Sequence, residues 1–118
     1  MSDDRSEDGK YVSWARAIKV KDGFKCVVCG KSGTEVYLES HHLSSWDWDI
    51  QNRYDINNGA TLCGSDSGCR SHKLFHQIFG YGGNHAFQFE QYKKIYNILK
   101  NIISSSAPID SSLNVTQK

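Results

Sequence analysis

Apolar positions near the start of the chain recur at helical spacing. Trp14, Ala17 and Ile18 recur at three- and four-residue steps, and Gly23 follows shortly after them. This period predicts a short amphipathic helix that begins near residue 11, with Gly23 as the left-handed residue that ends it. Trp14 is most simply a core anchor, and stacking on a nucleic-acid base is the alternative. Residues 1–10 lack an apolar period and are largely acidic or polar, so we expect a disordered leader there.

The middle of the chain carries shorter segments that favour β-structure. Residues 36–43 are rich in β-forming side chains, and residues 60–63 follow the strong turn signal of residues 57–59. We expect these two segments to be a strand and its returning partner. Residues 24–30 are also expected to form a strand, which leads into a tight turn.

Helical spacing returns in the last third of the chain. Residues 70–80 predict a helix, and residues 86–103 predict a second amphipathic helix that packs across the core. The inward face of the first helix is expected to consist of Leu74, Ile78 and, next to them, Phe75 and Phe79. The apolar face of the second is expected to consist of Phe87, Tyr92, Ile95, Tyr96, Leu99, Ile102 and Ile103. Residues 104–118 have a disordered composition, so the pattern predicts one α+β domain over residues 11–103, with its core motif in residues 24–80.

Length and cysteine content narrow the options. A chain of 118 residues fits one domain with a modest core, and cores of this size are often stabilised by disulfides or a bound metal. The sequence shows neither an apolar signal segment nor an apolar run of membrane length, so we expect a soluble, cytoplasmic protein without a membrane partner. In a reducing compartment a C-x2-C pair such as Cys26 and Cys29 more often holds a metal than a disulfide, while redox-active or free buried thiols stay open as alternatives.

Charge is informative only locally. The formal net charge of +1, from 14 basic and 13 acidic residues, does not by itself indicate a nucleic-acid-binding protein. Residues 16–31 are basic, with five lysines or arginines against one aspartate. A cationic face of this kind can bind phosphate groups, and a solvated lysine-rich helix face is the equally simple alternative.

One short stretch, from His41 to His76, gathers four of the five histidines and two of the four cysteines. His72 and His76 are four residues apart on the predicted helix and therefore share one face. His41 and His42 end the predicted strand, along which neighbouring side chains point to opposite sides. A His-x3-His pair alone is more often a surface feature, and Asn58 before a glycine is by itself most simply a turn residue. Their occurrence together favours a metal-dependent site.

The order of these pieces resembles the HNH nuclease family with its ββα-metal motif. The matching segments are residues 38–42, 58–63 and 72–76, and residues 26–30 are similar to the first half of the four-cysteine zinc site that many such domains carry. The similarity extends over roughly residues 12–80. It implies a small α+β domain of the ββα-metal (His-Me finger) type and a metal-dependent DNA endonuclease. Small stand-alone members of this kind occur in phages and mobile elements.

The resemblance implies roles for individual residues. His42 would be the general base, because an imidazole that titrates near neutral pH can take a proton from water. His41, His72 and His76 would bind the catalytic divalent ion and leave coordination positions open for phosphate and water. Asn58 resembles the middle Asn of the family, which orients the base histidine by hydrogen bonding.

A structural zinc site would use the four thiolates of Cys26, Cys29, Cys63 and Cys69. The second half of the family's site is usually C-x2-C with His directly after it, whereas this chain has C-x5-C and two further residues before His72. The extra residues are rich in Gly and Ser and can loop out, so Cys69 is expected as the fourth ligand. A histidine in its place is the alternative.

Three imidazoles favour Zn²⁺, Ni²⁺, Co²⁺ or Mn²⁺ over Mg²⁺, which prefers oxygen ligands, although many members of the family use Mg²⁺. We expect Mg²⁺ or Mn²⁺ in the cell, and double-stranded DNA as the partner of a monomer or weak dimer. The residues expected to contact DNA are Arg16, Lys19, Lys25, Arg53, Arg70 and Lys73. Two other classes of function stay open: a non-catalytic zinc module that binds nucleic acid or protein, and a thiol redox protein that uses the C-x2-C pair.

Overall fold

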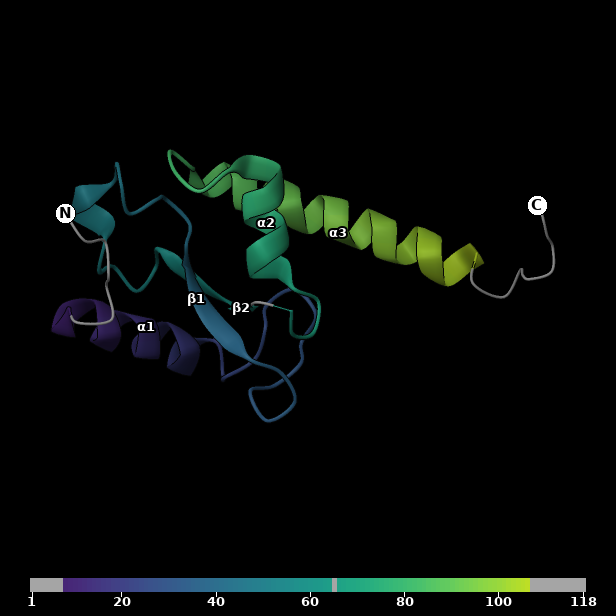
Figure 1. Cartoon of the computed structure of the whole chain (residues 1–118), viewed down its shortest axis with the longest axis horizontal. Helices are drawn as coiled ribbons and strands as arrows, with labels where there is room; N and C mark the ends of the chain where they lie inside the picture. Colours follow the sequence, from purple (N-terminus) through teal and green to yellow (C-terminus); the bar gives the residue numbers. More distant parts are fainter. Residues whose placement is uncertain (1–7, 65, 107–118) are drawn as a thin grey trace.

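The computed structural model describes residues 8–64 and 66–106 of the chain (Figure 1). Its elements are α1 (Gly9–Lys21), β1 (Leu38–His42), the 3-10 helix η2 (Ile50–Asn52), β2 (Gly59–Cys63), α2 (Ser71–Phe79) and α3 (Ala86–Ser106). In Figure 1 the hairpin of β1 and β2 lies between α1 on one side and α2 on the other, and α3 runs past α2 away from the hairpin. The predicted α+β class is confirmed.

The hairpin is short and tightly covered. β1 and β2 pair antiparallel, with Leu38 opposite Cys63 at one end and His42 opposite Gly59 at the other. All five residues of β2 are buried. A Cβ atom at Gly59 would come within 2.7 Å of the Trp14 ring, so the glycine allows α1 to pack closely against this end of the hairpin.

The first helix begins earlier than predicted. Asp8 caps α1, because its carboxylate accepts hydrogen bonds from two backbone N–H groups of the first turn. The expected disordered leader therefore reached too far: Asp8 caps the helix and residues 9–10 are part of it, while residues 1–7 lie outside the described part. Gly23 follows the helix with a φ of +70°, which confirms the predicted stop.

The segment of residues 24–30 forms turns, so the prediction of a strand there is wrong. Lys25 makes a single antiparallel bridge with Ser32, and the N–H of Gly30 donates to the carbonyl of Cys26 at 2.8 Å. The turn replaces the strand because it folds the two cysteines of this segment toward one point, which an extended chain cannot do.

The core joins the hairpin to the two C-terminal helices. Its buried side chains include Leu62, Phe75, Phe89 and Tyr92. Ile78 was expected to face inward but is 55% exposed, because the buried face of the nine-residue helix α2 is limited to Ser71 and Phe75. The expected apolar face of α3 is likewise mostly exposed, at Phe87, Ile95, Leu99, Ile102 and Ile103. Only the beginning of α3 meets the core, and its later turns extend beyond the hairpin (Figure 1).

The last helix is longer than predicted. It runs to Ser106, three residues beyond the expected end, because extending an established helix by one turn needs little intrinsic propensity. Residues 107–118, the rest of the expected tail, lie outside the described part. Neither α3 nor any other helix in the described ranges combines the length and the apolar character that a membrane crossing requires.

Candidate metal centres and active site

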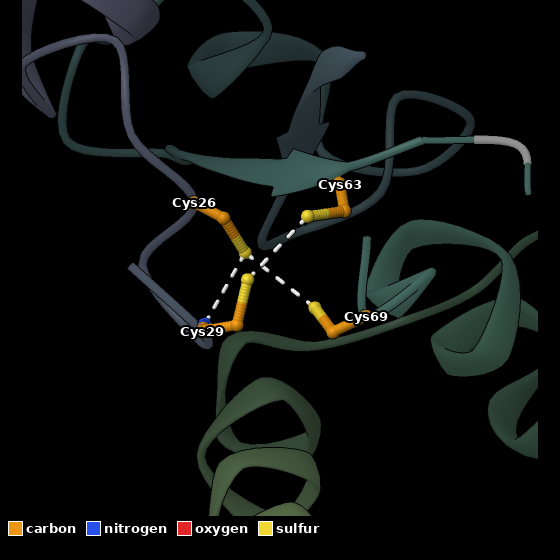
Figure 2. Close-up of side chains that lie close together, drawn as sticks. All are labelled: Cys26, Cys29, Cys63 and Cys69. Carbon is orange, nitrogen blue, oxygen red and sulfur yellow. Dashed lines mark hydrogen bonds between the residues drawn. The ribbon is translucent and has the colours of Figure 1, made fainter. Parts of the chain in front are cut away.

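Four cysteine thiols meet beside one end of the hairpin (Figure 2). Their sulfur atoms all lie within 4.8 Å of one another, and the Sγ–Sγ distance is 3.7 Å between Cys26 and Cys69 and 3.5 Å between Cys29 and Cys63. Tetrahedral zinc with Zn–S bonds of about 2.3 Å requires sulfurs roughly 3.8 Å apart, whereas a disulfide bond is about 2.05 Å long. These free thiols are therefore positioned to form a zinc site.

Three separate segments bring the thiols together. Cys26 and Cys29 lie in the turn that follows α1, Cys63 ends β2, and Cys69 precedes α2. Two backbone N–H groups of the turn point at the Cys26 sulfur, at 3.4 and 3.5 Å. Donors arranged in this way stabilise a thiolate, which is the form that binds a metal.

Hydrogen bonding within the cluster favours an anionic sulfur at Cys26. The Cys69 thiol donates to it, and together with the turn N–H groups this lowers the pKa of Cys26 to about 4. The same contact raises the pKa of Cys69, and burial raises the pKa of Cys63 to about 11. The cluster thus holds one thiolate near neutral pH, and a soft cation would displace the remaining thiol protons.

The inserted loop before Cys69 closes back onto the hairpin. The Ser67 hydroxyl accepts a hydrogen bond from the N–H of Tyr37 at 2.8 Å. Gly68 has a φ of +54°, and a Cβ atom there would lie 2.5 Å from the Cys63 sulfur, so a side chain would not fit. Cys69, rather than a histidine, is the fourth member of the cluster.

Three imidazoles meet on the α2 side of the hairpin. His41 of β1 faces His72 and His76 of α2, with ring centroids 5.2 and 5.3 Å away, and those two rings are 5.0 Å apart. One ring nitrogen of each lies within 4.8 Å of the others. The shared helix face of His72 and His76, expected from their spacing, is what brings two of the three rings together.

Hydrogen bonds orient two of these rings. The Nδ1–H of His72 donates to Glu39 Oε1 at 2.7 Å, and the Nδ1–H of His76 donates to the carbonyl of Gly80 at 2.8 Å. In both rings the Nε2 lone pair remains for a cation, the arrangement by which metalloproteins orient histidine ligands. The hydrogen bond from His72 holds the pKa of Glu39 below its ordinary value.

The third ring, His41, provides a test of whether a metal fits. It is 2% exposed, and its Nε2 is the one buried side-chain nitrogen or oxygen of the described residues that has no hydrogen-bond partner. Burial, reinforced by the neighbouring imidazoles, holds the pKa of His41 well below its ordinary value, and burial also lowers the pKa of His76. Unprotonated imidazoles and an orphaned buried nitrogen are what a cation site requires, so the three histidines fit a divalent metal ion.

His42 lies against α1, on the other side of the hairpin from α2. Its ring stacks on Trp14 with centroids 3.8 Å apart and an interplanar angle of 11°, and Trp46 stands edge-on to it at 5.7 Å. The Nε2 of His42 is 2.8 Å from the carbonyl of Arg53. Because a carbonyl only accepts, Nε2 carries the hydrogen and the neutral ring has its lone pair on Nδ1.

One pocket joins His42 to the three-imidazole cluster. Its volume is about 170 Å³, and its lining consists of Tyr11, Ser40, His41, His42, Ser45, Trp46, Asp47, His72, His76 and Tyr81. Tyr81 is 79% exposed and stacks on His76, with centroids 4.6 Å apart and an angle of 9°. A base and a cation site that open into the same space can act on one bound group.

Asn58 fixes the long loop that precedes β2. Its Oδ1 accepts a hydrogen bond from the N–H of Ser44 at 2.7 Å, and its Nδ2 donates to the carbonyls of Ser44 and Asn52 at 3.1 and 2.9 Å. Asn52 directly precedes Arg53, whose carbonyl holds His42. These bonds connect Asn58 to His42 through the loop backbone.

Three of the cations expected to contact DNA lie close to the imidazole cluster. Arg16 and Lys19 of α1 line a groove of about 450 Å³ that reaches Glu39 and His72. Lys73 lines a second groove, of about 440 Å³, together with His72 and other residues of the cluster's rim. The two grooves meet at His72.

The other three expected cations do not line these two grooves. The Arg53 guanidinium is 4.3 Å from the centroid of the Trp46 ring, and its Nε donates to the Trp46 carbonyl at 2.8 Å. Arg70 is 3.8 Å from a carboxylate oxygen of Asp66. Lys25 is exposed next to the cysteine turn.

The sequence did not identify two side chains as contacts of the candidate site histidines. Glu39 lies two residues before His41, so strand alternation puts it on the same face, and this spacing could have identified it as the partner of a ligand histidine. Trp14 was expected as a core anchor, with stacking on a nucleic-acid base as the alternative, and not as a neighbour of His42. Its contact with His42 joins residues far apart in the sequence, and no local pattern indicates it.

Comparison with known proteins agrees with this geometry. A family model described as HNH endonuclease matches residues 26–73. The matched segment contains the four cysteines, His41, His42, Asn58 and His72, and it ends before His76. Neither the curated proteins nor the solved structures returned a significant match.

Proposed function

We propose that the protein, whose residues 26–73 match a family model described as HNH endonuclease, is a metal-dependent endonuclease that hydrolyses phosphodiester bonds in double-stranded DNA. In this proposal His42 is the general base. His41, His72 and His76 are the residues that would hold a single divalent ion.

The observation that carries the proposal is the pocket shared by His42 and the three imidazoles. A purely structural zinc module needs the cysteine cluster alone. It gives no reason for a buried His41 nitrogen without a partner, next to two rings whose Nδ1 atoms are already hydrogen-bonded. A cation site beside a base gives that reason.

The chain's own residues prepare the site. A bound divalent ion supplies Lewis-acid stabilisation of negative charge on the phosphate and on the leaving oxygen. Glu39 and the Gly80 carbonyl fix the direction of two Nε2 lone pairs, and Phe75 packs edge-on against the His41 ring with centroids 4.6 Å apart. Rings held in this way need little reordering when substrate binds.

His42 takes the proton of the attacking water. Its Nε2–H remains on the Arg53 carbonyl, so Nδ1 accepts the proton while the water oxygen bonds to phosphorus and the bond to the leaving oxygen breaks. The imidazolium that results lies against the face of the Trp14 indole, which stabilises a cation.

The cations around the pocket support a DNA substrate. Arg16 and Lys19 line one groove that reaches His72, and Lys73 lines the other groove that reaches it. Lysine and arginine contacts of this kind position the phosphate backbone without reading its sequence. The low net charge of the whole chain is therefore compatible with a local binding face.

We expect Mg²⁺ or Mn²⁺ to serve in the cell, although three imidazole ligands also suit Zn²⁺, Ni²⁺ and Co²⁺. The free thiols of the cysteine cluster favour a reducing, cytoplasmic compartment, which is the host cell if the gene belongs to a phage or mobile element.

Cleavage of supercoiled plasmid tests the proposal. Zinc-loaded protein should produce nicked or linear DNA with an added divalent ion and none with EDTA. The variant His42→Ala should lose cleavage by about 10²-fold or more while it keeps its zinc and its DNA affinity. His85→Ala is the matched control, because His85 packs on Trp48 outside the pocket, and this variant should cut like the wild type.

Two results would contradict the proposal. A plasmid that stays intact with every metal tried would identify the chain as a non-catalytic zinc module. Cleavage by His42→Ala at the wild-type rate would remove His42 as the base.

A further inference from the structure

We propose that Trp14 is a positioning residue of the active site, whose indole face holds the His42 ring in the orientation that proton transfer requires. The inference rests on the proposed nuclease function. It extends the site to α1, which lies outside the segment that matches the family model.

Trp14 is itself held firmly in place. It is 3% exposed, its Nε1–H donates to the carbonyl of Asp55 at 2.8 Å, and the absence of a side chain at Gly59 leaves room for its ring against β2. Asp55 lies two residues after Arg53. The same short piece of loop therefore anchors the indole through one carbonyl and holds His42 through another.

These contacts define the plane and the rotation of the His42 ring. An interplanar angle of 11° at 3.8 Å is full face-to-face contact, so a tilt of the imidazole would open a gap or cause a clash with Trp14. Rotation within the plane would break the hydrogen bond from Nε2 to Arg53. A ring fixed on its face and at one nitrogen directs its other nitrogen in one direction only, and His42 lines the pocket that also contains the imidazole cluster.

Arg53 and Trp46 also help to hold the His42 ring in place. The Arg53 side chain donates to the Trp46 carbonyl and lies over the Trp46 ring, and that ring contacts His42 edge-on. Arg53, whose carbonyl holds His42, is thus fixed by Trp46, which also contacts His42. These contacts come from Trp14, Trp46, Arg53 and the loop carbonyls, whereas the ion would be held by His41, His72 and His76, so loss of Trp14 should affect proton transfer without affecting metal affinity.

A core residue and a positioning residue differ in what their loss changes. Loss of packing lowers stability, whereas misplacement of a base by about 1 Å can lower the rate by about 10²-fold in a protein that is still folded. Trp14→Leu removes the aromatic face and Trp14→Phe retains one. The matched control is Ile18→Ala, because Ile18 is one turn further along α1, is fully buried and packs over Gly59.

The experiment measures plasmid cleavage by zinc-loaded proteins, at a temperature at which circular dichroism shows each variant folded. Trp14→Leu should lower kcat by about 10²-fold with KM and DNA affinity unchanged, Trp14→Phe should retain most of kcat, and Ile18→Ala should keep kcat despite its lower stability. Equal kcat for Trp14→Leu and Ile18→Ala overturns the inference, as does Trp14→Phe as slow as Trp14→Leu.

A second measurement covers the case in which Trp14→Leu does not fold. The ring current of a stacked indole should shift the His42 ring protons upfield in the wild-type NMR spectrum, and Trp14→Phe, which keeps an aromatic face, should retain most of this shift together with most of kcat. Unshifted His42 protons in the wild type overturn the inference. A wild type that leaves plasmid intact counts against the nuclease function itself, whereas a cleaving wild type with an equally active Trp14→Leu counts against this inference alone.

Discussion

Replacement of Glu39 isolates the contribution of one hydrogen bond to metal binding. Its carboxylate accepts a hydrogen bond from the Nδ1–H of His72 at 2.7 Å. This bond involves only one of the three imidazoles and none of the cysteines. The carboxylate is also confined, because it lies directly against Gly64, where a Cβ atom would clash with it. We expect Glu39→Gln and Glu39→Ala to weaken binding of a divalent ion at the histidines and to leave zinc at the cysteines.

The size of the effect follows from the type of contact. Loss of a hydrogen-bond partner behind a metal-binding histidine typically costs about 10- to 100-fold in metal affinity, which is about 1.4 to 2.7 kcal/mol. Glu39→Gln keeps an oxygen that can accept from His72 but loses the charge, so it should fall near the lower end. Glu39→Ala loses the acceptor and allows the ring to turn, so it should fall near the upper end.

Calorimetric titration of Mn²⁺ or Ni²⁺ into protein with zinc-filled cysteines measures this difference. The matched control is Glu90→Gln on α3, an exposed carboxylate that pairs with Lys93 far from the imidazoles in sequence and should bind the ion like the wild type. Wild-type affinity in Glu39→Ala would refute the reasoning, because His72 would then need no orientation or would not be a ligand.

Two further substitutions test the two ligand sets. Cys69→Ser should release zinc at EDTA concentrations that the wild type withstands. It should also lower Tm by more than about 5 °C, since zinc binding contributes to the free energy of folding. If mass spectrometry shows that this variant keeps its zinc, a histidine is the fourth ligand instead. His41→Phe removes the buried nitrogen that has no partner, so it should abolish Mn²⁺ binding yet stabilise the metal-free protein by about 1 kcal/mol in urea unfolding. A less stable metal-free variant would contradict the view that this nitrogen is held ready at a cost.

Much of the site was readable from local sequence patterns. A helical spacing of four puts His72 and His76 on one face whatever surrounds the helix, and the order of strand, turn and strand brings His41 toward them. The C-x2-C pair likewise indicates a metal turn from its spacing and its glycine. These features depend on short-range geometry, which a sequence displays directly.

The remaining features depend on contacts between distant parts of the chain. The stack of Trp14 on His42 and the exposure of Ile78 follow from where α1 and α2 dock, and periodicity does not contain that information. Asp8 is a different case: an aspartate directly before a helical segment is a recognised cap signal, and the expectation of a disordered leader gave weight only to the missing apolar residues. The exposed apolar side chains of α3 show that an amphipathic period indicates a helix without showing that its apolar face is covered.

The hairpin carries a member of each candidate ligand group on one ladder, with Cys63 in the pair at one end and His41 three pairs further along. At about 3.4 Å per residue these two pairs are roughly 10 Å apart. We expect a chelator to remove an ion from the imidazole pocket first, and re-addition of Mg²⁺ or Mn²⁺ to restore the proposed cleavage activity of protein stripped only there. Longer exposure to the chelator should remove zinc from the cysteines, and the β1–β2 pairing should then be lost from the end that carries Cys63. Inactivation should therefore proceed in two stages, and Mg²⁺ or Mn²⁺ should reverse only the first.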